Sequence, residues 1–137
     1  MADITVTAAS VLASSTAVLN RQYNFAATVT AGQTVYLNSS NKWALFDQDS
    51  ATGAAITDKR GIALNGGALD QPAVVVEEDT GFTSGGTMTV GTAVYGSSNA
   101  GAITHDVPGS GKYPVLLGMP KSTTVMVLKP VAGGVAV

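Results

Sequence analysis

Gly32-Gln33-Thr34-Val35-Tyr36 is the stretch that decides the fold, because a close copy, Gly91-Thr92-Ala93-Val94-Tyr95, follows 59 residues later. Each copy is followed by a turn rich in Ser and Asn and then by a polar loop. Each continues through a glycine-centred apolar segment (residues 60–64 and 116–119) to a valine-rich strand (residues 74–76 and 125–128). The repetition predicts an internal duplication of a β unit, with copies at roughly residues 31–77 and 90–129.

Strand signals are short and frequent, whereas helix signals are weak. Thr, Val and Gly recur throughout the chain, and these residues lower helix propensity. Residues 23–30 alternate between two sets of side chains with the period of a half-buried strand. Residues 34–37 and 43–46 flank a Ser/Asn turn and predict a hairpin. Short strands with a turn signal about every ten residues are typical of a sandwich or barrel. We therefore expect an all-β fold, a single compact β-barrel or β-sandwich.

The chain length fits one domain. At 137 residues it is long enough to bury a core of its own. We expect a single β domain at residues 21–137, preceded by an extended N-terminal arm at residues 1–20 that contacts a partner. Residues 131–137 are small, apolar and uncharged. Because free termini are usually loose unless they dock, we expect this tail to pack against another surface.

Composition excludes several classes of protein. Charged residues make up 12% of the chain, against about 25% in typical soluble domains, and the net charge is −2. Seven scattered Lys and Arg form no basic stripe, so we expect no direct nucleic-acid partner. No apolar run approaches the ~18 residues that span a bilayer, so we expect no membrane partner. The absence of cysteine excludes disulfides and thiolate metal sites.

Motifs of catalysis and phosphate binding fail on inspection. His105 is the one histidine and lies beside Asp106, but no nucleophile-elbow pattern accompanies it. Residues 109–112 read Gly-Ser-Gly-Lys, but a P-loop needs a Gly earlier and a Ser or Thr where Tyr113 stands. We therefore expect no enzymatic activity and no cofactor.

Two groups of acidic residues lie before residue 80. Asp47 and Asp49 have the spacing of a calcium loop that ends at Asp58, but Ala51 and Thr52 replace a ligand and the required glycine. We expect no metal there. The run at residues 77–79, Glu-Glu-Asp, is either a solvated strand end or a rim that meets basic residues of a partner.

Aromatic and apolar side chains supply the candidate partner contacts. Core packing is the favoured interpretation of the aromatic residues. Trp43, which follows Lys42 at the end of a turn, is the first candidate among them for partial exposure, and the sequence leaves both environments open. Aromatic anchors are frequent at protein interfaces. An extended apolar arm or tail can add a strand to a neighbour's sheet edge. The predicted interface residues are Ile4, Val6, Val11, Leu12, Trp43, Val135 and Val137.

The repeated motif carries a family resemblance. Residues 31–36, 60–67 and 71–74 in the first copy resemble a family of small tailed-bacteriophage head proteins, the capsid decoration or cement proteins. So do residues 91–95, 113–119 and 134–136, and the likeness covers roughly residues 20–137. Its motifs are structural glycines and valines, so no catalytic residues carry over.

The resemblance implies a β-rich protein, often trimeric, that binds the outside of an assembled shell. We therefore expect a homotrimer on the capsid exterior of a virion, with the phage major capsid protein as partner. Residues 1–5 have neither the basic region nor the apolar core of a signal peptide, so we expect synthesis in the host cytoplasm. An alternative is a carbohydrate-binding or adhesin-like module on a head fibre or tail, with an aromatic platform around Trp43, Phe46 or Tyr36.

Overall fold

The computed structural model describes residues 2–50, 59–133 and 137. Its strands are β1 (Val18–Asn20), β2 (Asn24–Phe25), β3 (Thr34–Leu37), β4 (Lys42–Leu45), β5 (Arg60–Ala63), β6 (Val75–Thr83), β7 (Val94–Gly96), β8 (Ile103–Thr104), β9 (Val115–Pro120) and β10 (Val125–Ala132). One short 3-10 turn, η1 (Ala8–Ser10), precedes them, and the described residues contain no α-helix. Nor do they include a helix long and apolar enough to cross a membrane. The expectation of an all-β fold is confirmed.

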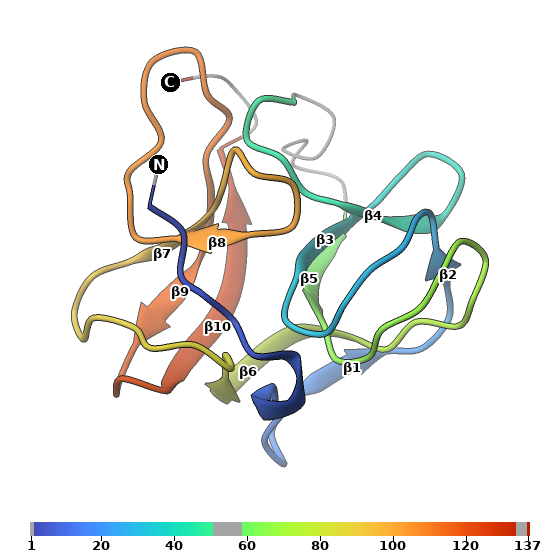
Figure 1. Ribbon diagram of the computed structural model, residues 1–137, viewed down its shortest axis with the longest axis horizontal. Helices are drawn as coiled ribbons and strands as arrows, with labels where there is room; N and C mark the ends of the chain where they lie inside the picture. The colour runs from blue at the N-terminus through green and yellow to red at the C-terminus, as the bar shows by residue number, and fades with distance from the viewer. Residues whose placement is uncertain (1, 51–58, 134–136) are drawn as a thin grey trace.

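All ten strands belong to one mixed sheet. Its order is β2-β4-β3-β5-β6-β10-β9-β7-β8, and β1 pairs with β6 beside this path (Figure 1). The sheet is not closed, so the barrel alternative is wrong. The two end strands, β2 and β8, are each two residues long, and their outer edges bridge to Pro72 and Asp3 respectively. Since irregular chain covers both edges, neither strand is available to pair with the other.

The two copies of the repeated unit pair their strands in the same order. The first runs β4-β3-β5-β6 and the second β8-β7-β9-β10, and the antiparallel pair of β6 and β10 joins them at the centre of the sheet. The repeated valines occupy matching positions, because Val35 pairs with Gly61 and Val94 pairs with Gly118.

Glycines recur in both copies for steric reasons. The first residue of each repeated motif has a left-handed backbone, with φ of 93° at Gly32 and 80° at Gly91. In β5, a Cβ atom at Gly61 would collide with the carbonyl oxygen of Val76 in β6. In β9, a Cβ atom at Gly118 would collide with the carbonyl oxygen of Val127 in β10. The matching contacts identify Val76 and Val127 as equivalent positions of the two copies.

Each half contributes to a hydrophobic core. The first core holds Phe25, Val29, Val35, Leu37, Trp43, Ala63, Ala73 and Val75. The second holds Val11, Phe46, Ile62, Val76, Phe82, Met88, Val94, Ile103, Val115, Leu117, Met126 and Leu128. Three residues of the first copy, Phe46, Ile62 and Val76, lie in the second core, so the second half packs over one side of the first.

Residues 2–20, the N-terminal segment, lie on their own domain and do not project from it (Figure 1). Asp3 bridges Thr104 of β8, and Leu12 bridges Thr83 of β6. Further along, β1 pairs with β6. The segment therefore runs along both halves and forms part of the sheet, rather than an extended arm.

The strand predicted at residues 23–30 is shorter than expected. Only β2 is regular, because the chain bends after Phe25. The bend lets both Phe25 and Val29, four residues apart, enter the first core. Val29 then exchanges backbone hydrogen bonds with Gly67 instead of continuing a ladder. Tertiary packing of these two side chains outweighs the local strand pattern.

Candidate functional site

Reactive side chains are not clustered in the described part of the chain. No group of three or more His, Cys, Asp or Glu there could hold a metal ion. The ring of His105 is used structurally, because the Thr89 N–H donates to its Nε2 at 2.9 Å and its Nδ1 lies 3.1 Å from the Ala93 carbonyl oxygen. The carbonyl contact requires the proton on Nδ1. His105 therefore ties the loop before β7 to the end of β8.

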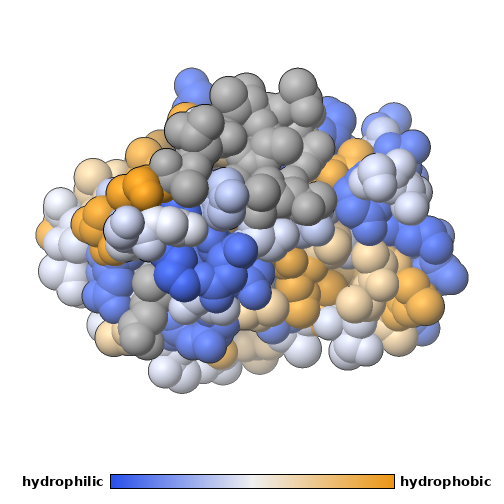
Figure 2. Space-filling model, turned by 90° about the horizontal axis from the view of Figure 1, so that it is seen from above, coloured by the Kyte–Doolittle hydropathy of each residue, from blue (hydrophilic) through white to orange (hydrophobic). Residues whose placement is uncertain are grey.

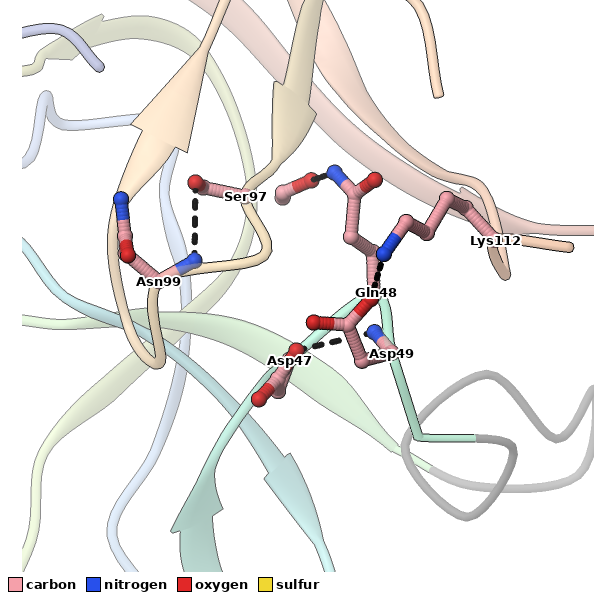
Figure 3. A network of polar contacts seen from close by, with 7 residues as sticks. Asp47, Gln48, Asp49, Ser97, Asn99 and Lys112 are labelled. Carbon is pink, nitrogen blue, oxygen red and sulfur yellow. Dashed lines mark hydrogen bonds and ion pairs between the residues drawn. The ribbon is translucent and has the colours of Figure 1, made fainter. Parts of the chain in front are cut away.

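Asp47, Gln48 and Asp49 lie at the junction of the two halves (Figure 3). The buried Gln48 side chain donates from Nε2 to the Gly96 carbonyl at 2.9 Å, and its backbone N–H donates to Ser97 at 3.1 Å. Asp47 accepts the N–H of Asp49 at 2.8 Å, and the Asp49 carboxylate pairs with Lys112. Residues 47–49 therefore connect the first half of the sheet to the second. The later positions of the calcium-like spacing, Asp58 included, lie outside the described residues.

The three acidic residues at 77–79 lie in different environments. Glu77 pairs with Lys59 at 3.8 Å, and Glu78 is exposed. Asp79 is buried and accepts hydrogen bonds from the Ser14 backbone (2.7 Å) and hydroxyl, the Gly81 N–H (2.9 Å) and the Thr16 hydroxyl (3.2 Å). Burial alone would raise the pKa of Asp79, but these hydrogen bonds outweigh it and hold the pKa below its usual range. Asp79 is thus the anchor of the N-terminal segment, not part of a shared acidic rim.

Four predicted interface residues lie in the N-terminal segment, and three of them face inward. Val11 is buried in the second core, and Ile4 and Val6 pack against it half-buried. Leu12 points outward with 62% of its surface exposed. Of the four, Leu12 is the one available for a partner while the segment stays docked.

Of the two environments that the sequence left open for Trp43, the structure shows the core. Trp43 is completely buried in the first core, with its ring edge-on to Tyr23 at a centroid distance of 6.3 Å. It pairs with Leu37 across the β3–β4 hairpin, and the neighbouring Lys42 turns the other way to pair with Asp70. Phe46 is also buried, so neither residue forms a surface platform for a sugar ring.

The C-terminal residue Val137 is docked through its backbone. Its N–H donates to the Lys112 carbonyl at 2.8 Å, and its carbonyl accepts the Gly111 N–H at 2.9 Å. Its side chain remains exposed. Val135, the other residue predicted in the tail, lies outside the described residues.

Sequence reasoning missed an apolar surface on β9 and β10, which we name the hairpin face: Leu116, Met119, Val127 and Val131. Met119 pairs with Val127 and Leu116 pairs with Val131 across the two strands, and all four side chains are exposed. The available signal was the unbroken apolar run 125–128, because strands apolar on both faces are usually covered on both. Figure 2 shows one side of the molecule, where exposed hydrophobic residues form separate patches on either side of a hydrophilic region.

The hairpin face has a buried counterpart in the first copy. Since Gly61 corresponds to Gly118 and Val76 to Val127, the pair Ile62–Val76 corresponds to Met119–Val127. The first pair is completely buried in the second core, whereas Met119 and Val127 are 45% and 39% exposed. Equivalent strand surfaces are thus covered in one half and open in the other.

Comparison with known proteins finds no matching family model, no matching curated protein and no matching solved structure.

Proposed function

We propose that this chain is a virion structural protein that binds the outer surface of a phage capsid and stabilises it by bridging neighbouring major capsid protein subunits. The observation that supports bridging is the presence of two separate surfaces with exposed apolar side chains on one sheet: the outer side of the N-terminal segment around Leu12, and the hairpin face. A protein that joins neighbours needs at least two contact surfaces. The family resemblance supplies the partner, and the expected homotrimer multiplies each weak contact.

The surface of the N-terminal segment suits contact with a shell. The exposed residues around Leu12 are Thr5, Thr7, Ala8, Ala9 and Ser10, all small and uncharged. Small neutral side chains lose little hydration free energy when a partner covers them, whereas charged ones lose much more. The segment is also held by bridges at Asp3 and Leu12, so little conformational entropy is lost on binding.

The test is to add the purified protein to undecorated heads, separate bound from free protein by sedimentation, and heat both preparations. Decorated heads should open at a higher temperature than bare heads. Leu12→Lys should weaken binding, because a charge would be buried at the contact. Val90→Lys is the matched control, since Val90 is also an exposed aliphatic residue but lies in the loop before β7. If decorated and bare heads open at the same temperature, the proposal is wrong.

A further inference from the structure

A hollow of about 230 Å³ lies on the outer side of β6 and β10, next to the hairpin face. Its walls include Thr16, Val18, Glu78, Thr80, Val127 and Lys129. Val18 and Val127 leave apolar surface open to solvent inside it. Neither Glu78 nor Lys129 forms an ion pair with any residue that the structure describes. The hollow thus combines an apolar floor with one free charge of each sign.

A second exposed feature, the turn that carries Leu69, also combines an apolar side chain with charged ones. Leu69 stands out from the turn between β5 and β6 with 58% of its surface exposed. Next to it, Asp70 pairs with Lys42 at 2.5 Å. The turn is rigid, because the Gln71 side chain accepts the Ala68 N–H at 2.8 Å and the Asp70 N–H donates to Phe25 at 2.9 Å. Leu69 is therefore an exposed apolar side chain beside a surface ion pair.

Leu69 and the hollow lie apart in the molecule. The backbone bonds of the turn place Leu69 beside β2, at one end of the sheet, whereas the hollow lies over β1, β6 and β10 near its centre (Figure 1). In one chain the two features are kept apart, so they can meet only between copies. Contact between two different surfaces of identical chains is head to tail, and such contacts close into rings when the rotation permits.

The similarity of the two copies supports the view that another chain covers the hollow. Val127 is one wall of the hollow, and its equivalent in the first copy, Val76, is covered by the other half of the chain. No described residue covers Val127 in the same way. The second copy therefore presents the type of surface that the first copy buries within the chain.

We propose that copies of this chain associate head to tail, with Leu69 of one copy seated in the hollow between β1, β6 and β10 of the next. The contact removes Leu69, Val18 and Val127 from water, which favours association. It also brings Asp70 towards Lys129 and Lys42 towards Glu78, so opposite charges set the orientation of the two copies. For the number of copies, this contact rests on the proposed function. It deepens that function by naming what holds the expected trimer together.

Light scattering coupled to gel filtration tests the contact. The unmodified protein should be oligomeric at micromolar concentration, and Leu69→Lys and Val127→Lys should each be monomeric. Val107→Lys is the control, because Val107 is 73% exposed but lies outside both surfaces, and it should remain oligomeric. All three positions are exposed, so circular dichroism should show the same fold in every variant.

Mixing the two monomeric variants is the decisive step. Leu69→Lys keeps an intact hollow and Val127→Lys keeps an intact Leu69, so an equimolar mixture should form pairs of one copy of each and nothing larger. A monomeric unmodified protein, oligomeric single variants, or a mixture that stays monomeric would each overturn the inference.

Head binding separates this inference from the proposed function. If the mixture forms pairs but the unmodified protein does not bind heads, the contact between copies stands and the proposed function fails. If the unmodified protein binds heads while the single variants remain oligomeric, the proposed function stands and the Leu69 contact fails.

Discussion

The backbone N–H of Ser14 donates to the carboxylate of Asp79 at 2.7 Å, across 65 residues of sequence. Asp79 lies in β6, the strand of the first copy that pairs with β10 of the second, and Ser14 lies in the N-terminal segment. The segment is therefore held at the centre of the sheet by a buried carboxylate as well as by backbone bridges at its ends.

Acid should weaken this anchor. The folded pKa of Asp79 is lowered, so its contribution to the free energy of unfolding is present above the unfolded pKa and is lost as the pH falls through the folded pKa. We expect stability to decline as the pH falls below the usual pKa range of an aspartate. Asp79→Asn should flatten this decline and cost about 1–3 kcal/mol at neutral pH, because an amide NH₂ replaces one acceptor oxygen.

Urea unfolding at a series of pH values measures the effect. The control is Glu78→Gln, which removes a neighbouring carboxylate that is exposed. Equal pH slopes for Asp79→Asn and the unmodified protein would contradict the role given to Asp79.

Gly118→Ala should destabilise the protein because its methyl group would collide with the Val127 carbonyl oxygen. We expect a loss of about 1–3 kcal/mol or more, and a similar loss for Gly61→Ala against Val76. Gly109→Ala is the matched control, since no atom lies within 4 Å of its added Cβ. Thermal unfolding of the three variants compares them. An unchanged midpoint for Gly118→Ala would show that β10 can move aside.

Trp43→Ala should cost about 3–5 kcal/mol, because it empties a large volume in the first core. Trp43→Phe should cost less, because most of the apolar volume is kept. Trp43 is the only tryptophan, so its fluorescence reports on this position alone. Acrylamide should quench it poorly in the folded protein and strongly after unfolding. Strong quenching in the folded protein would mean that the ring is exposed.

Lys112→Ala should change the free energy of unfolding by less than about 1 kcal/mol. Its partner Asp49 is 47% exposed and Lys112 is 38% exposed, so water and salt screen the ion pair. Denaturant unfolding at low and high salt measures the difference. A loss well above this bound would mean that the pair, rather than Gln48 and Phe46, holds the two halves together.

Local signals predicted a large part of the fold. The hairpin of β3 and β4 was predicted because the turn at residues 38–41 encodes it locally: the Asn38 side chain accepts the Ser40 N–H at 3.0 Å. The bend after Phe25 was not predicted, because it depends on Gly67, which is distant in sequence. Of the candidate contacts, Leu12 and Val137 have exposed side chains, whereas Trp43 does not. No local pattern distinguishes a core tryptophan from an exposed one.

The sequence by itself determined that the chain forms short strands in two similar halves, because turn residues, strand periods and repeated glycines act on the backbone within a few residues of themselves. The tertiary structure alone decided which strand surfaces are covered. Ile62–Val76 and Met119–Val127 are both apolar pairs, and they differ only in what packs over them. Whether a strand surface is covered depends on which distant segment packs against it. The second half packs over β5 and β6, and the N-terminal segment packs over Asp79. That approach is set by packing across the whole chain, which leaves the hairpin face and the hollow open to solvent.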